Sequence, residues 1–276
     1  MNLVQINVWL DVIFVALYIF VLLFLIFHFT LFVTTGRFRK AFVEGHWPTH
    51  EERPPATPKA LHAVHMVSMI ILGFTGMYLR FPFFYGGRIA MRDTHYVFMV
   101  IVIVVLFWRV WYAFFSKHKD WDAFAIRKKD VQSALGVLAY YGYFSNNKPH
   151  VAKYNVLQKM SYFLFLIMMF AQMFTGLALV KSSLFMGVSP SYLILGWWSG
   201  ALGGQELTLW YARTIHYILN WLFIIMTTVH LYLAATVDVP CALDFFGIRE
   251  MQVADGHGHD ETPAKESEPA IAPQTA

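Results

Sequence analysis

The chain has 276 residues, of which 58% are hydrophobic and only 14% are charged, with a formal net charge of +4. Soluble domains carry about 25% charged residues, so a chain with a mean hydropathy of +0.50 cannot cover itself with polar side chains as a soluble monomer. The composition excludes a soluble enzyme and a nucleic-acid binder, and the single cysteine, Cys241, excludes an internal disulfide and a cysteine-based cluster or zinc site.

Five apolar runs follow one another along the chain, at about residues 8–34, 61–80, 94–115, 157–180 and 212–236. Each supplies about 20 or more residues, enough to cross a hydrocarbon core about 30 Å thick as a helix. The first run has no positive n-region and no small-residue cleavage site, so we expect it to be retained. The predicted fold class is therefore an all-α integral membrane protein with five transmembrane helices.

The charges in the loops predict how these helices are oriented. Loops and tail on one side of the predicted membrane carry 14 Lys and Arg residues, and the other side carries 5. Because positive loops stay in the cytoplasm, the N-terminus is predicted to be outside and the C-terminus inside.

The same pattern divides the chain into four parts. Residues 1–36 form an extra N-terminal helix, and residues 37–60 form a cytoplasmic loop in which four prolines keep 48–58 out of a helix. Residues 61–246 form a four-helix domain, whose 182–210 loop is expected to lie across the outer interface. Residues 247–276 are expected to be a disordered cytoplasmic tail, because they lack apolar periodicity.

Four histidines in the predicted spans are expected to form two pairs. His216 and His230 lie 14 residues apart in the last helix, which places them on one face about 21 Å apart. The predicted topology brings His95 to the depth of His216 and His62 to the depth of His230. Ionisable groups at such depths are costly and mark function.

Two stacked histidine pairs in a helix bundle suit two b-type haems, since imidazole is a common haem ligand. Zinc would need more ligands at each level. A channel or proton relay would need acidic residues, and the last four runs contain none. His65, one turn from His62, is the chief alternative at the inner site, and His28 is a weaker one.

Three cations are candidates to neutralise haem propionates. Lys59 precedes His62 by three residues, Arg213 precedes His216 by three, and Arg109 follows His95 by 14, on the same helix face. Simple membrane anchoring explains Lys59 and Arg213 equally well, and snorkelling is the alternative for Arg109. Thr75-Gly76 and Thr175-Gly176 lie at corresponding outer helix ends, where small residues allow either helix packing or the approach of a flat macrocycle.

Residues 58–240 resemble the bacterial cytochrome b561-like membrane subunits of respiratory complexes. This family includes the b-type cytochrome subunits of nickel–iron hydrogenases, formate dehydrogenases (their gamma subunits) and thiosulfate reductases. The resemblance rests on Lys59-x-x-His62 with Thr75-Gly76, on His95 with Arg109, on the run from Tyr154 to Lys159, and on His216-x4-Trp221-x8-His230-x-Tyr232. The chain departs from the family in its first helix and in Ala63, where the family often has Trp.

The resemblance implies two haem b groups and a quinone site near the inner haem, around Asn155 and Gln158. The side-chain amides can hydrogen-bond quinone oxygens, although helix capping by Asn155 and solvent exposure of Gln158 explain them as well. The implied partners are a periplasm-facing iron–sulfur or multihaem electron-transfer subunit with its catalytic subunit, quinone and membrane lipid.

The sequence thus predicts a dihaem cytochrome b of the bacterial inner membrane that transfers electrons between a periplasmic partner and the quinone pool. The alternative is a membrane anchor subunit whose haem sites are structural or incomplete. A transporter is disfavoured because the spans are unbroken and lack acids.

Overall fold

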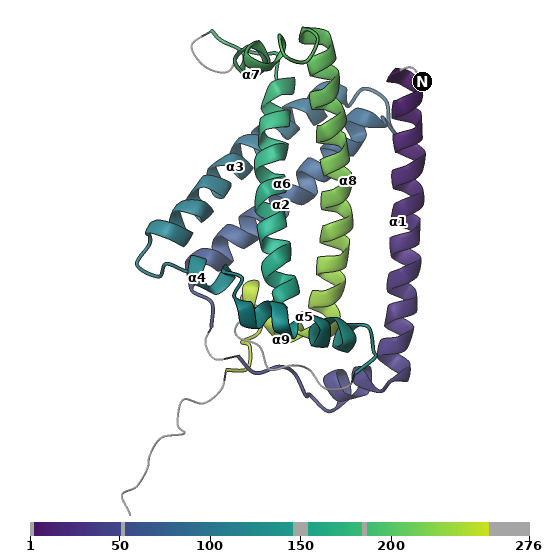
Figure 1. Cartoon of the computed structure of the whole chain (residues 1–276), viewed down its shortest axis with the longest axis vertical. Helices are drawn as coiled ribbons and strands as arrows, with labels where there is room; N and C mark the ends of the chain where they lie inside the picture. Colours follow the sequence, from purple (N-terminus) through teal and green to yellow (C-terminus); the bar gives the residue numbers. More distant parts are fainter. Residues whose placement is uncertain (1–2, 51–52, 146–153, 184–186, 254–276) are drawn as a thin grey trace, which may run out of the picture.

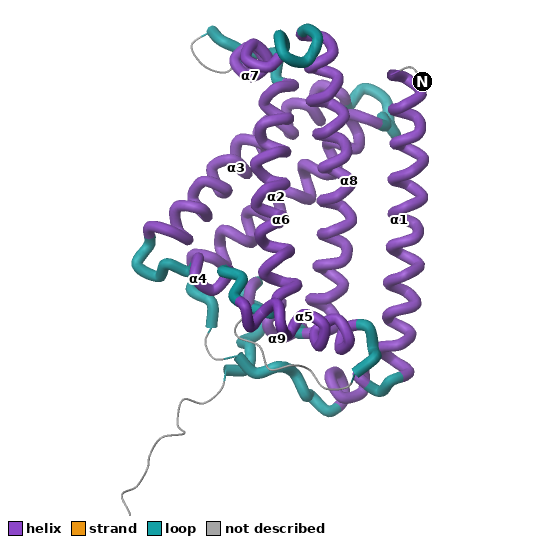
Figure 2. The backbone as a smooth tube through the Cα atoms, in the orientation of Figure 1, coloured by secondary structure: helices purple, strands orange, loops and turns teal. Residues whose placement is uncertain are grey.

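The computed structural model describes residues 3–50, 53–145, 154–183 and 187–253. These residues form helices joined by loops and contain no strand (Figure 2). Five helices are long and apolar enough to cross a membrane: α1 (Leu3–Thr34), α2 (Ala56–Arg80), α3 (Arg88–Phe115), α6 (Val156–Leu179) and α8 (Gln205–Val237). The predicted all-α architecture with five spans is confirmed.

Shorter helices lie at the two ends of these spans. At the end where α3 and α8 begin, called the upper end from here on, α7 (Pro190–Trp198) lies across α6 and α8 (Figure 1). At the opposite, lower end lie a π-helical turn (Arg39–Val43), α4 (Trp121–Phe124), α5 (Lys128–Tyr141) and α9 (Val239–Phe245). The sequence predicts that the upper end is periplasmic and the lower end cytoplasmic.

All five spanning helices begin earlier than hydropathy predicts, α6 by one residue and the others by five or more. The helix α2 begins at Ala56 and α8 at Gln205, each more than one turn before the apolar run. Hydropathy marks only the segment inside the hydrocarbon, whereas the helical hydrogen bonds continue into the interface. Pro58 therefore lies in the first turn of α2, where its missing N–H is not needed, and the expectation that 48–58 contains no helix is wrong from Ala56 onward.

The four later spans form two close pairs that meet in an apolar layer. The helices α2 and α3 pack along each other, as do α6 and α8, while contacts between the two pairs are sparse. A buried cluster at mid-height joins the pairs through Val102 and Leu106 of α3, Met168 and Met169 of α6, and Leu219 and Phe223 of α8. This layer separates the upper and lower halves of the bundle.

The extra helix α1 docks on this bundle through a few polar contacts at different heights. Arg80 of α2 pairs with both carboxylate oxygens of Asp11 at 2.9 and 2.8 Å. Tyr18 hydrogen-bonds Thr228 of α8 at 3.2 Å, and Phe14 stacks on Trp221. Most other side chains of α1 are exposed and apolar, as expected for a helix surrounded by lipid.

At the lower end the chain stays packed as far as Val253. Met251 is buried, and the backbone N–H of His50 donates to the carbonyl of Gln252 at 3.0 Å. The first residues of the segment predicted as a tail therefore pack against the 47–50 segment. Residues 254–276 lie outside the described residues.

Candidate functional site: two histidine pairs across the bundle

The structure brings the four predicted histidines together as two pairs. His95 of α3 and His216 of α8 form the upper pair, with ring centroids 6.4 Å apart. His62 of α2 and His230 of α8 form the lower pair, with centroids 6.3 Å apart. Each pair therefore joins the α2–α3 half to the α6–α8 half, and the apolar layer lies between the two levels.

Two threonines orient the rings of the upper pair. The Thr75 hydroxyl donates to the carbonyl of Ile71 at 2.7 Å and lies 2.8 Å from Nδ1 of His95. The Thr175 hydroxyl donates to the carbonyl of Ala171 at 2.7 Å and lies 3.1 Å from Nδ1 of His216. Since each hydroxyl proton is already used, each hydroxyl accepts from an imidazole Nδ1–H, and the lone pair is left on Nε2. A neighbour that fixes the tautomer of a ligating histidine is a common feature of metal sites.

Gln172 supports the same tautomer at His216. Its side-chain Nε2 lies 3.3 Å from Nε2 of His216 and donates to it. The Gln172 carbonyl oxygen is buried without a hydrogen-bond partner among the described residues. Such buried orphans are rare in native structures and often accompany a bound group.

Two glycines keep the space beside the upper pair open. A Cβ atom on Gly176 would lie 3.1 Å from Cε1 of His216, and a Cβ atom on Gly76 would lie 3.5 Å from Cε1 of His95. In both Thr-Gly dipeptides the threonine orients a ring. The close approach requires glycine only at Gly176, because a Cβ at Gly76 would make an ordinary contact.

The lower pair is more open than the upper one. His62 and His230 are both exposed, and the His62 ring packs edge-on against Phe245 of α9, with centroids 5.2 Å apart. The alternative residue His65 makes no ring contact with His230 among the described residues. The geometry therefore favours His62 over His65.

His28 has no free ring nitrogen. Its Nε2 lies 2.9 Å from the carbonyl of Tyr141, so that nitrogen must donate. Its Nδ1 lies 2.6 Å from the hydroxyl of Tyr232 and accepts from it. His28 therefore connects α1 to α5 and α8, and it offers no lone pair to a metal.

The donor set at each level fits haem better than a bare metal ion. Metal–imidazole bonds are about 2.0–2.1 Å long, so two rings with an iron between them have centroids about 6.3 Å apart. Among the described residues, the only group of three or more metal-ligating side chains is His50, Asp238 and Cys241, so neither pair has a third ligand. Two imidazoles would suffice to hold an iron whose other ligands come from a porphyrin.

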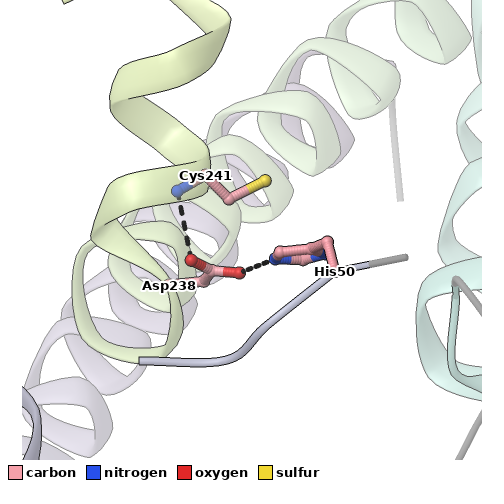
Figure 3. A group of neighbouring side chains, drawn as sticks. All are labelled: His50, Asp238 and Cys241. Carbon is pink, nitrogen blue, oxygen red and sulfur yellow. Dashed lines mark hydrogen bonds and ion pairs between the residues drawn. The ribbon is translucent and has the colours of Figure 1, made fainter. Parts of the chain in front are cut away.

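The His50, Asp238 and Cys241 group fastens the lower end. His50 Nε2 lies 2.6 Å from Asp238 Oδ2, and Asp238 Oδ1 accepts from the backbone N–H of Cys241 at 3.1 Å (Figure 3). Asp238 therefore caps α9 and holds the 47–50 segment, and both of its oxygens are already engaged. Burial raises the pKa of the Cys241 thiol to about 12, with the carboxylates of Asp238 and Asp244 adding to the effect.

The cations predicted to neutralise propionates fall into two classes. Lys59 donates to Asp244 at 2.5 Å, and Arg109 pairs with both oxygens of Asp120 at 3.1 and 2.8 Å. Each of these two neutralises a carboxylate of the chain itself, and its binding to a propionate stays a prediction. Arg213 instead lines an open cavity of about 380 Å³ at the upper end.

Asp244 is the centre of the lower ion-pair network. Burial of its carboxyl opposes ionisation, but hydrogen bonds from Lys59 and Arg53 outweigh it and hold its pKa below the ordinary value. Arg53 donates to it at 2.6 Å. The network ties α9 to the start of α2, just below His62.

Asn155 and Gln158 form a reciprocal capping box at the start of α6. The backbone N–H of Gln158 donates to Asn155 Oδ1 at 3.0 Å, and the backbone N–H of Asn155 donates to Gln158 Oε1 at 2.9 Å. The capping function weighed from the sequence is present, with Asn155 buried and Gln158 exposed. The box uses both amide oxygens and leaves the two NH₂ groups for other partners.

Lys159, next to this box, forms a buried ion pair. Its Nζ donates to Asp130 Oδ2 of α5 at 2.8 Å, and the two side chains are only 5% and 10% exposed. Hydrogen bonds from Lys159 and from the backbone of Arg127 hold the pKa of Asp130 below its ordinary value. The pair fixes α5 to the start of α6.

Replacing Asp130 with Asn is expected to destabilise the protein by about 3–5 kcal/mol, because Lys159 would remain buried and charged without its counter-ion. The pKa of Asp130 is lower in the folded than in the unfolded state. The contribution of its carboxylate to stability is therefore complete above the unfolded-state pKa, near 3.9, and is lost as the pH falls below that value. Thermal unfolding in detergent from pH 7 to pH 3 measures both effects. The matched control is Asp122→Asn, whose pair with Arg127 is more than 60% exposed and should change stability by about 0.5 kcal/mol or less. Equal losses from the two variants would contradict the assignment.

The sequence did not identify the ring-orienting function of Thr75 and Thr175, or Gln172. The recurrence of Thr-Gly at equivalent depths is a signal that could have found the threonines. Gln172 has a weaker signal, an isolated amide in an apolar span one turn before Gly176.

Comparison with known protein families identifies a match. The family model described as prokaryotic cytochrome b561 matches residues 53–240, which include both histidine pairs and leave out α1. This match confirms the resemblance seen in the sequence. Neither the curated proteins nor the solved structures give a match.

Proposed function

The chain belongs to the prokaryotic cytochrome b561 family, and from this premise we propose that it is a dihaem subunit carrying electrons across the bacterial inner membrane. The coarser statement, that it is a multi-pass membrane b-type cytochrome of electron transfer, follows from the family and from the five spans. The two histidine pairs, at matching ring spacings of 6.4 and 6.3 Å, are the single observation that carries the dihaem proposal.

His95 and His216 would hold one haem, and His62 and His230 the other. Haem b, when bound, supplies one-electron chemistry. Thr75 and Thr175 keep the lone pair of each upper imidazole on Nε2, while the apolar layer around Leu106 and Phe223 excludes water between the two levels. The two histidine levels are about 21 Å apart, because 14 residues of α8 separate His216 from His230.

Transmembrane electron transfer can be tested in vesicles that contain the purified chain and trap ferricyanide. Dithionite added outside should reduce the trapped ferricyanide, whereas vesicles with the His216→Ala variant or without protein should not. Reduction no faster than in protein-free vesicles, with the chain loaded with haem, would refute the proposal.

We further propose that the upper end faces the periplasm, where an iron–sulfur or multihaem subunit and its catalytic subunit exchange electrons with the chain. The support is the excess of Lys and Arg at the lower end. Alkaline phosphatase fused after residue 276 should be inactive, because this enzyme works only in the periplasm, and an active fusion would reverse the orientation.

The quinone site is proposed at the lower end, near the start of α6. Polar groups gather there: the Asn155 side chain hydrogen-bonds the Tyr141 phenol, and His28 connects the Tyr141 carbonyl to the Tyr232 hydroxyl. Tyr232 lies two residues from His230, so hydrogen-bonding groups and a haem ligand lie at one level. Quinone reduction needs both a haem edge and a route for protons.

The amide NH₂ groups of Asn155 and Gln158 are the expected hydrogen-bond donors to quinone. The Asn155→Asp/Gln158→Glu double variant keeps the capping oxygens but removes these donors. It should retain both haems, and its quinone-coupled turnover should fall tenfold or more. A tenfold loss corresponds to about 1.4 kcal/mol, roughly the contribution of one hydrogen bond. Activity with an artificial electron carrier, measured in parallel, should survive. Unchanged quinone activity would place the site elsewhere.

A further inference from the structure

The open cavity at the upper end is lined by four cationic side chains. These are Arg88 and Arg92 of α3, Lys181 just after α6, and Arg213 of α8. Leu79, Ile89, Leu179 and Leu209 complete its wall, and its volume is about 380 Å³. The residues that line it include no acid.

Most of this positive charge has no ion-pair partner in the part of the chain that the structure describes. The one ion pair of the lining cations among the described residues joins Arg92 to its neighbour Asp93, and both side chains are at least half exposed. The cations of the lower end differ, because Lys59 and Arg53 share Asp244 and Arg109 holds Asp120. The two ends of the bundle therefore differ in net local charge.

The cavity lies one turn beyond the upper histidine pair on all four helices. Arg92 precedes His95 by three residues and Arg213 precedes His216 by three, about 4.5 Å along each helix. Leu79 follows Thr75 by four residues, and Leu179 follows Thr175 by four. The residues that line the cavity therefore continue the helix faces that surround the upper pair, and its cations would face an anionic group placed directly above that pair.

We propose that this cavity binds the two propionates of the haem held by His95 and His216, and that Arg88, Arg92 and Lys181, with Arg213, raise its reduction potential. The proposal rests on the proposed function. Carboxylates prefer paired guanidinium and ammonium donors, and the leucine and isoleucine side chains suit the apolar edge of a macrocycle. Unpaired cations near a redox centre favour the state that holds one more electron, and exposure to solvent weakens this effect without removing it.

A potentiometric titration of the purified full chain, followed by its visible spectrum, tests the proposal. The step that disappears in His216→Ala identifies the upper haem. Arg88→Gln and Lys181→Gln should each lower the reduced-to-oxidised ratio of that haem at fixed potential by about fivefold, and the double variant by more. Arg88→Lys keeps the positive charge and should therefore keep most of the wild-type reduced-to-oxidised ratio. Lys117→Gln, an exposed charge at the lower end, is the control and should leave the upper step unchanged.

Three other outcomes would overturn the proposal in distinguishable ways. An unchanged upper step in Arg88→Gln/Lys181→Gln, with two haems retained, refutes the propionate site alone. A loss of co-purifying anionic phospholipid in that variant, with the potential unchanged, assigns the cavity to a lipid phosphate. A wild-type chain without the upper haem refutes the proposed function itself.

Discussion

Replacing His216 with alanine is expected to remove one haem and leave the other in place. His216 is the α8 member of the upper pair, and the bond of its Nδ1–H to Thr175 leaves on Nε2 the lone pair that a metal would take in place of the Gln172 amide. His95→Ala should give the same result, while His62→Ala and His230→Ala should each remove the lower haem. Haem quantification on each purified variant gives the count.

His65→Ala is the matched control for this series. It lies one turn from His62 on α2 but has no ring contact with His230 among the described residues. It should therefore keep both haems. If His65→Ala lost a haem while His62→Ala kept two, the assignment of the lower ligand would be reversed.

Gly176→Leu is expected to exclude the upper haem while the lower haem stays. Its Cβ would lie 3.1 Å from Cε1 of His216, tighter than ordinary contact, and the rest of the side chain would fill the space beside the ring. Helix α6 itself should stay formed, because leucine forms helices better than glycine by about 1 kcal/mol. The measurements are the haem count and the loss of the upper step in a redox titration.

Gly73→Leu separates this steric effect from a general effect on the helices. Gly73 also lies in a spanning helix, but a Cβ there meets nothing within 4 Å. This variant should keep two haems. Loss of the upper haem from both variants, or from neither, would mean that Gly176 does not form part of the haem site.

The positions of the spans and the pairing of the histidines could be predicted because both follow from periodicity. A run of 20 apolar residues determines a span, and a separation of 14 residues determines a shared face. Neither depends on long-range detail. The helix starts were less predictable, since α2 and α8 continue into the interface where hydropathy carries no signal.

The ion pairs could not be predicted for a related reason. Lys59 finds its carboxylate in Asp244, 185 residues away, and nothing in the local pattern of either residue points to the other. Arg109 meets Asp120 only because the chain turns back after α3 ends at Phe115. The cations of the upper cavity likewise come from three separate segments, so only Arg213, which lies near His216, was predicted from the sequence.

His28 shows the limit of reasoning from depth alone. Its place in the first span made it a possible ligand, but ligation also needs a free lone pair, and that depends on Tyr141 and Tyr232. These partners come from helices more than 100 residues away in the sequence.

The haem-to-protein ratio of the purified chain tests the central claim most directly. A pyridine haemochrome assay, with a dithionite-reduced spectrum of the same sample, should give two haem b per chain with the absorption of bis-imidazole ligation. One haem per chain, or none, would contradict the account and favour a membrane anchor with incomplete haem sites.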